Sequence, residues 1–275
     1  MILAAPQVQS ALASTTEPAG AISTRFSYTA TVPKVPQGTH GLDVWLPLPS
    51  DNAFQKVTNV NVDADVDYLI TREQKFGNRM VYVHFGDPQG TPKVTVSFDV
   101  ERREASGTKS PVQQRIVPDD YLLPDRLVPV NGRFHDIAEE VAGSQPTAMG
   151  KAKAFFQHIL DTMTYDYDKK SPEYGQGDVA FVCDYKSGNC SDLHSYLISL
   201  SRAMGIPAYI EYGFPITGIP LGDPIPEKGK IGGYHCWAWL DIDGTWMPFD
   251  ASDARKWLDV HDSKMKNHLL GHLVL

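Results

Sequence analysis

The spacing of apolar residues changes once along this chain of 275 residues, near residue 102. Before that point apolar and polar residues alternate, which is the pattern of strands with one face buried and one face in water. After it apolar residues recur at intervals of three and four, which is the pattern of amphipathic helices. This order favours an α+β protein in which a strand-rich part precedes a part that begins with helices.

The strand pattern predicts an antiparallel β-sandwich over residues 24–103. Clusters of Gly, Pro, Asn and Asp separate its apolar runs, as turns separate short strands. The expected strands lie around residues 26–32, 44–46, 57–70, 80–85 and 94–100. The polar stretch 102–118 has no periodicity and is interpreted as a linker, so a second domain is expected over residues 119–275.

The second domain should contain both helices and strands. Helical spacing covers residues 134–141, 152–163 and 190–204, and strand patterns cover residues 208–214, 234–242 and 245–250. Asn189 is the expected N-cap of the third helix, and Gly205 lies just past its end. These assignments put Cys190 in the first turn of a helix.

Charge and hydropathy exclude two kinds of partner. The formal net charge of -8 is spread along the chain, whereas a nucleic-acid-binding surface needs clustered basic residues. No stretch approaches the roughly 20 consecutive apolar residues that a membrane helix needs. We therefore expect no nucleic-acid partner and no membrane span, and the length is enough for a stable core without a cofactor.

The N-terminal residues carry one targeting signal. Ala11-Leu12-Ala13 has the small-x-small form of a leader-cleavage site. A leader remnant predicts a periplasmic or secreted protein. The alternative is a cytoplasmic protein with a disordered terminus.

Cys190 has the position of a reactive thiol. A thiolate is stabilised at the positive end of a helix, particularly beside an imidazole. The same helix start presents backbone N–H groups, which could stabilise the oxyanion of a tetrahedral intermediate. The sequence therefore favours Cys190 as a nucleophile.

A hairpin supplies a base and its orienting acid. Asp243-Gly244 is a strong two-residue turn signal between two apolar runs. Counting back from this turn pairs Trp237 with Asp250. His235 and Asp250 then lie on one face as diagonal neighbours, roughly 7–8 Å apart at Cα. This spacing allows Asp250 to orient an imidazole that serves as the base for a thiol.

These residues resemble the core of the transglutaminase-like superfamily. The resemblance covers about residues 119–255 and rests on Gly188-Asn189-Cys190-Ser191-Asp192, Arg202-Ala203-Met204-Gly205-Ile206-Pro207-Ala208, Tyr234-His235-Cys236-Trp237-Ala238-Trp239 and Gly244-Thr245-Trp246-Met247-Pro248-Phe249-Asp250. It implies a papain-like fold with the triad Cys190, His235 and Asp250. The strand-rich half is similar to the β-domain that often precedes this core in bacterial secreted proteins.

The resemblance implies acyl transfer from an amide of a peptide or protein. Hydrolysis, by a cysteine peptidase or amidase, is favoured, and a cross-linking transglutaminase is the alternative. Trp237 should share a face with His235 and could line a substrate groove. Tyr165 and Asn189 are candidate substrate-binding residues because each could donate a second hydrogen bond to the oxyanion, as could Tyr167 and Gln176.

Three alternatives remain beside this interpretation. His194, four residues beyond Cys190 on one helix face, is a rival base. A zinc site could use Cys183, Cys190, His194, His235 and Cys236, but no C-x-x-C or H-x-x-x-H spacing is present, so no metal is expected. The third alternative is a catalytically inactive core that serves only for binding.

The other two cysteines are interpreted as small buried hydrophobes. Cys236 alternates with His235 along its strand and is therefore expected to face away from the site.

Overall fold

The computed structural model describes residues 21–103, 107, 118–214 and 234–260. The expected leader remnant and most of the expected linker lie outside these residues. Backbone contacts divide the described residues into two compact units, one with residues 21–103 and one with the remainder. Among the described helices, none is long and apolar enough to cross a membrane.

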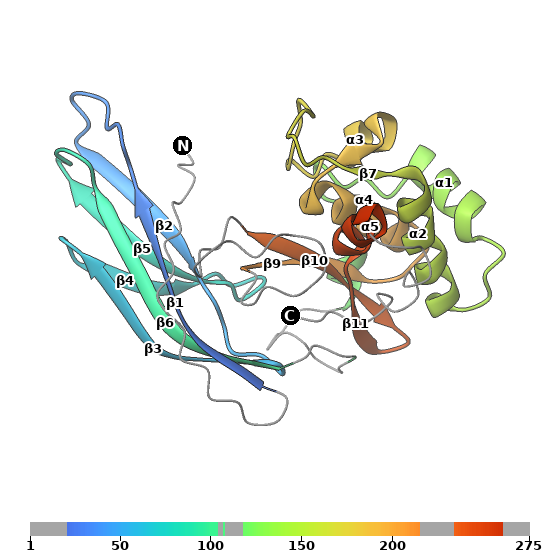
Figure 1. Ribbon diagram of the computed structural model, residues 1–275, viewed down its shortest axis with the longest axis horizontal. Helices are drawn as coiled ribbons and strands as arrows, with labels where there is room; N and C mark the ends of the chain where they lie inside the picture. The colour runs from blue at the N-terminus through green and yellow to red at the C-terminus, as the bar shows by residue number, and fades with distance from the viewer. Residues whose placement is uncertain (1–20, 104–106, 108–117, 215–233, 261–275) are drawn as a thin grey trace. The chain divides into compact units, whose positions relative to one another are not determined.

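The first unit consists of two antiparallel three-stranded sheets (Figure 1). One has the order β1 (Ala21–Thr31), β6 (Lys93–Arg103), β3 (Gln55–Ala64), and the other has the order β2 (Gly41–Leu48), β5 (Arg79–Gly86), β4 (Tyr68–Arg72). Alternate residues of β6 and β5 are buried, including Val96 and Val83. The Tyr28 hydroxyl donates to the Pro47 carbonyl and so joins the two sheets. The predicted strand-rich half is confirmed.

One predicted strand was wrong. The run 57–70 is divided between β3 and β4, which belong to different sheets. Asp65 and Asp67 interrupt it, and aspartate favours turns because its side chain bonds to nearby backbone. The apolar alternation continues through Val66, so periodicity alone did not show the break.

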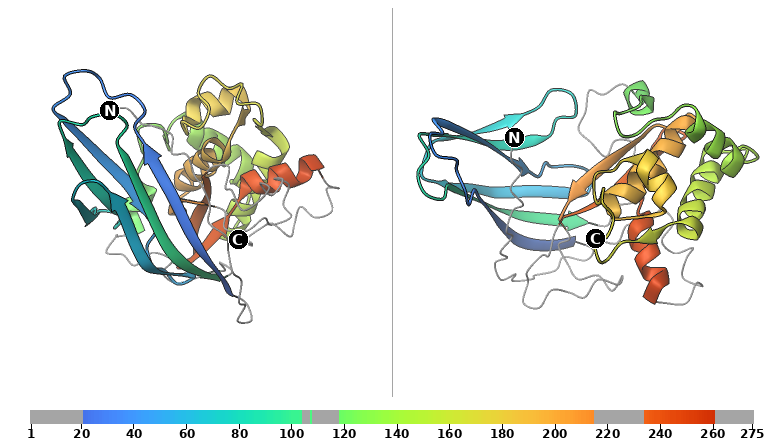
Figure 2. Two further views of the ribbon diagram at one scale, coloured as in Figure 1. Left: turned by 60° about the vertical axis from the view of Figure 1, so that its left-hand side comes forward. Right: turned by 90° about the horizontal axis from the view of Figure 1, so that it is seen from above.

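The second unit packs helices around a three-stranded sheet and a short strand pair (Figures 1 and 2). The helices are η1 (Pro118–Leu122, a 3-10 turn), α1 (Arg133–Ala142), α2 (Ala148–Thr162), α3 (Val179–Tyr185), α4 (Cys190–Ala203) and α5 (Ala251–Val260). The sheet has the order β11 (Thr245–Phe249), β10 (His235–Ile242), β9 (Ala208–Gly213), and β7 (Thr164–Tyr165) pairs in parallel with β8 (Ser187–Gly188).

Helix α4 is the centre of the second unit. It contacts α1, α2, α3, α5 and strand β10, so its residues from Cys190 to Ser201 are buried on every side. The amphipathic spacing predicted from the sequence implies one buried face, so the buried surface of α4 is wider than that pattern indicates. The expected start is confirmed, because the Asn189 side chain accepts hydrogen bonds from the N–H groups of Ser191 and Asp192.

The β10–β11 hairpin has the predicted register. Its ladder runs from Ile242 opposite Thr245 to Ala238 opposite Phe249. Both turn residues, Asp243 and Gly244, have positive φ, as a type I′ turn requires. Strand β11 ends at Phe249, so Asp250 is the link from the sheet to α5 and not a strand residue.

Candidate active site

Cys190 is the first residue of α4, and its side chain is 3% exposed. It receives hydrogen bonds from Cys236 and His235. The bond from Cys236 has the largest effect on the pKa of Cys190. Together with the bond and positive charge of His235 it outweighs burial, which raises the pKa, and lowers it to about 4.

The helix start leaves one backbone donor beside this sulfur. Asn189 accepts from the N–H groups of Ser191 and Asp192 through its side chain, and from that of Leu193 through its carbonyl. The N–H of Cys190 itself is the remaining first-turn donor, with no hydrogen-bond partner assigned among the described residues. An oxyanion next to the sulfur can bind this group.

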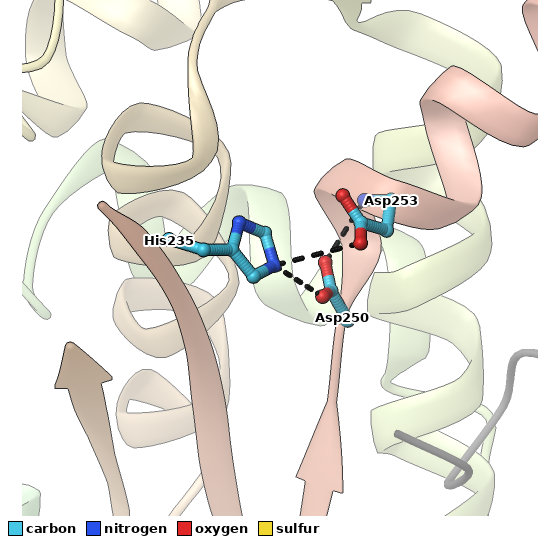
Figure 3. Close-up of side chains that lie close together, drawn as sticks. All are labelled: His235, Asp250 and Asp253. Carbon is cyan, nitrogen blue, oxygen red and sulfur yellow. Dashed lines mark hydrogen bonds and ion pairs between the residues drawn. The ribbon is translucent and has the colours of Figure 1, made fainter. Parts of the chain in front are cut away.

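His235 and Asp250 form a buried ion pair. Nε2 of His235 lies 2.6 Å from Oδ2 of Asp250, and Figure 3 shows the other ring nitrogen turned away from both neighbouring carboxylates. Nδ1 is therefore the nitrogen left for Cys190. Oδ1 of Asp250 accepts from the Ser252 hydroxyl at 3.0 Å and from the Asp253 N–H at 2.9 Å, which fixes the carboxylate.

Charge within this pair sets its protonation. Burial alone would lower the pKa of His235, but the charges of Asp250 and Asp253 hold it well above its usual value. Burial would raise the pKa of Asp250, yet the charge of His235, with the hydrogen bond from His235, keeps it well below its usual value. An imidazolium facing a carboxylate is the result.

Asp253 is a weaker partner of the same imidazole. Its carboxylate lies 3.7 Å from Nε2 of His235 and is paired with Lys256 at 3.0 Å. His235, Asp250 and Asp253 also have the residue types of a metal site, with their ligand atoms within 4.8 Å of one another. Hydrogen bonding of His235 to Asp250 and neutralisation of Asp253 by Lys256 account for this cluster without an ion.

His194, the rival base, is fully buried behind the site. Its Nε2 accepts the N–H of Ala251 at 2.9 Å, and its Nδ1 lies 3.7 Å from the sulfur of Cys236. Both ring nitrogens therefore already have neighbours other than Cys190. The direct hydrogen bond to Cys190 comes from His235.

The expected position of Cys236 was wrong. Its sulfur lies 3.9 Å from the Ser191 hydroxyl and hydrogen-bonds to Cys190. Alternation does put Cys236 on the strand face opposite His235, but α4 packs on β10, with its first turn against the start of the strand. The site therefore includes side chains from both faces of β10.

The three predicted substrate-binding residues differ in what surrounds them. Trp237 shares a face with His235, as expected, with ring centroids 6.1 Å apart, and it is buried. Asn189 uses its side-chain oxygen as the helix cap, while its nitrogen lies 3.5 Å from the Tyr234 hydroxyl. Tyr165 packs on Tyr167 and under the Lys256 ammonium. Contact of these residues with substrate stays a prediction.

Two residues near the site were not singled out from the sequence. Tyr234 is half exposed, and its hydroxyl lies 3.3 Å from that of Ser191 at the start of α4. Asp192 is buried and accepts the N–H groups of Gly175, Gly177 and Asn189, each at 2.9 Å. It fixes the loop beside the helix start. Its sequence signal was the capping-box spacing from Asn189.

Known proteins resemble this chain over part of the second unit and over most of its length. Residues 135–251 match the model of the transglutaminase-like superfamily. A protein from Haemophilus influenzae, named only as uncharacterized, is 25% identical over 261 residues, covering 84% of this chain and 68% of its own length.

One solved structure is similar in fold, and a second matches more weakly. A candidate cysteine protease from Cytophaga hutchinsonii has a TM-score of 0.64 at 16% identity, over 86% of this chain and 78% of that one. The periplasmic domain of TgpA from Pseudomonas aeruginosa has a TM-score of 0.47 at 15% identity, over 98% of this chain and 81% of that one. The family match and the first of these folds show a transglutaminase-like domain preceded by antiparallel β-sheets.

Proposed function

Because the second unit contains a transglutaminase-like domain, we propose that this chain is a cysteine enzyme that hydrolyses an amide bond of a peptide or protein. One observation supports this most strongly. A thiol of lowered pKa begins a helix and is hydrogen-bonded to a histidine, which a buried aspartate holds at 2.6 Å. These are the components of a thiol nucleophile with an oriented base.

In this proposal each residue has its own step. The thiolate of Cys190 attacks the amide carbonyl, and the Cys190 N–H binds the developing oxyanion. Nδ1 of His235 gives its proton to the leaving amine as the C–N bond breaks, which leaves a thioester and a neutral imidazole. Asp250 keeps the imidazole in position throughout.

Water resolves the thioester in the second half of the reaction. Neutral His235 takes a proton from water, the hydroxide oxygen attacks the thioester, and the products are a carboxylic acid and the Cys190 thiolate beside imidazolium. Water needs no binding site of its own, whereas cross-linking needs a second site for an amine. We therefore take hydrolysis as the reaction.

Mass spectrometry of peptide substrates tests this proposal. A peptide library is incubated with the full chain, with and without a primary amine, and the products are identified as free acids or as amine adducts. We expect free acids in both conditions and no products with Cys190→Ala. Amine adducts in preference to acids would make the reaction a transamidation, and turnover by Cys190→Ala would overturn the nucleophile.

A periplasmic or secreted location remains part of the proposal. It rests on the small-x-small signal at residues 11–13. Fractionation of cells expressing the native gene tests it, and recovery in the cytoplasm alone would contradict it.

A further inference from the structure

Cys236 and His194 form a buried polar group behind the proposed nucleophile. Both side chains have no solvent exposure, although cysteine and histidine both have hydrogen-bonding groups. The steps assigned to Cys190, His235 and Asp250 do not use either of them. Their contacts nevertheless link the nucleophile to the segment that carries Asp250.

The hydrogen bonds of His194 determine its tautomer. The backbone N–H of Ala251 donates to Nε2 at 2.9 Å, so this nitrogen carries no proton. The Asp250 carboxylate is 3.4 Å from the same nitrogen, a longer contact than that of Ala251. The imidazole proton is then on Nδ1, which lies 3.7 Å from the sulfur of Cys236. His194 is therefore a donor to Cys236.

This assignment leaves the S–H of Cys236 free to donate in turn. Two acceptors are near it, the Ser191 hydroxyl at 3.9 Å and the sulfur of Cys190. A thiolate is the stronger acceptor of the two, since hydrogen bonds to charged groups are stronger than those between neutral groups. Exclusion of water from this position increases the difference.

We propose that Cys236 is a positioning residue that donates a hydrogen bond to the thiolate of Cys190, with its own orientation set by His194. This inference rests on the proposed function, in which Cys190 is the nucleophile. The chain runs from the Ala251 N–H through His194 and Cys236 to Cys190. It supports the thiolate from the strand face opposite His235.

The contrast between the two thiols agrees with this arrangement. Burial, followed by the hydrogen bond and charge of Cys190, raises the pKa of Cys236 well above its usual value. The pKa of Cys190 is lowered, with the hydrogen bond from Cys236 as the largest cause. Cys236 therefore stays protonated, and able to donate, over the pH range in which Cys190 is ionised.

The test measures the ionisation of Cys190 directly. The rate of iodoacetamide alkylation of Cys190 is followed by peptide mass spectrometry across pH, in a phosphine reductant that keeps both thiols reduced. Cys236→Ala and Cys236→Val both remove the donor, and the second, with a slightly larger side chain, leaves no cavity. Cys236→Ser keeps a donor, and Cys183→Ala is the matched control, because Cys183 is a buried thiol that contacts Tyr196.

We expect the Ala and Val variants to shift the alkylation midpoint upward by about one pH unit, as loss of one hydrogen bond to a charged group predicts. The Ser variant should shift less and the Cys183 variant not at all. Unchanged midpoints in the Ala and Val variants, with a low midpoint in the parent protein, would overturn the role of Cys236 and leave Cys190 as the proposed nucleophile. An ordinary thiol midpoint in the parent protein would instead overturn Cys190 as the nucleophile.

Discussion

Nε2 of His235 lies 2.6 Å from Oδ2 of Asp250, although the two residues come from different elements of the second unit. His235 begins β10, and Asp250 follows the last residue of β11. The hairpin register and the start of α5 together bring them into contact. The separation is short enough for a charge-assisted hydrogen bond, which fixes the imidazole orientation.

Replacing Asp250 tests the importance of this contact. Asp250→Asn removes the carboxylate and favours the wrong imidazole tautomer, so kcat should fall by about 10³-fold or more, as in triads with the same logic. Asp253→Asn is the matched control, because its carboxylate is 3.7 Å from the same nitrogen and is paired with Lys256. We expect less than about a tenfold loss there. Steady-state kinetics of both variants decide it, and the reverse order of losses would make Asp253 the orienting acid.

The pH dependence of kcat/KM should follow the thiolate and imidazolium together. Activity should rise as Cys190 ionises near its pKa of about 4, a value set first by the hydrogen bond from Cys236. It should fall as His235 loses its proton, at a pH well above 6.5, because Asp250 and Asp253 outweigh the effect of burial on that pKa. kcat/KM should be constant between the pKa of Cys190 and the pKa of His235. Kinetics on a peptide substrate between about pH 3.5 and pH 10 check it, and an acid limb near the usual thiol pKa of about 8.5 would contradict the proposed pair.

The two histidines should differ sharply in their effect on turnover. His235→Gln removes the proposed base, so kcat should fall by about 10³-fold, within the range of one general acid–base group. His194→Asn keeps a donor near the Nδ1 position, and His194→Gln keeps an acceptor near the Nε2 position. We expect the Asn variant to retain the low alkylation midpoint of Cys190 and the Gln variant to raise it, both with losses in kcat of about tenfold or less.

One outcome would exchange the roles of His194 and His235. If His194→Asn and His194→Gln abolished turnover while His235→Gln did not, His194 would be the base. Circular dichroism of each variant shows whether the fold is retained, since His194 is buried and bonded to the Ala251 backbone.

Local patterns were enough to predict the parts of the site that depend on neighbouring residues in sequence. Asn189 before Cys190 marked the helix start, and Asp243-Gly244 marked the register of the hairpin. Both features follow from backbone hydrogen bonds over a few residues. They were therefore readable without knowledge of the tertiary packing.

The position of Cys236 was not readable in this way. Alternation shows on which strand face a side chain lies but not which element covers that face. Cys236 became part of the site because the first turn of α4 packs there. The strand pattern was also expected to reach Asp250, whereas α5 begins at Ala251, and Asp250 accepts the N–H of Asp253 as an N-cap residue does.

The last prediction concerns what holds the hairpin in register. A slip of one residue would move Asp250 to the other face and leave His235 without its acid. Two features oppose such a slip: the turn, in which Gly244 has φ of 78°, and the buried ladder, in which Ala238 faces Phe249. Gly244→Val tests which of them matters, because a β-branched residue is strained at positive φ, whereas Gly244→Asn is tolerated there.

We expect the buried ladder to hold the register. Gly244→Val should then lower the free energy of unfolding by about 1–2 kcal/mol, the cost of a left-handed conformation, and leave kcat/KM of the folded protein within about twofold of the parent. Gly244→Asn should change both quantities little. Urea unfolding and steady-state kinetics measure the two effects separately. A loss of turnover as large as that of Asp250→Asn, with little loss of stability, would show instead that the Asp243-Gly244 turn sets the position of Asp250.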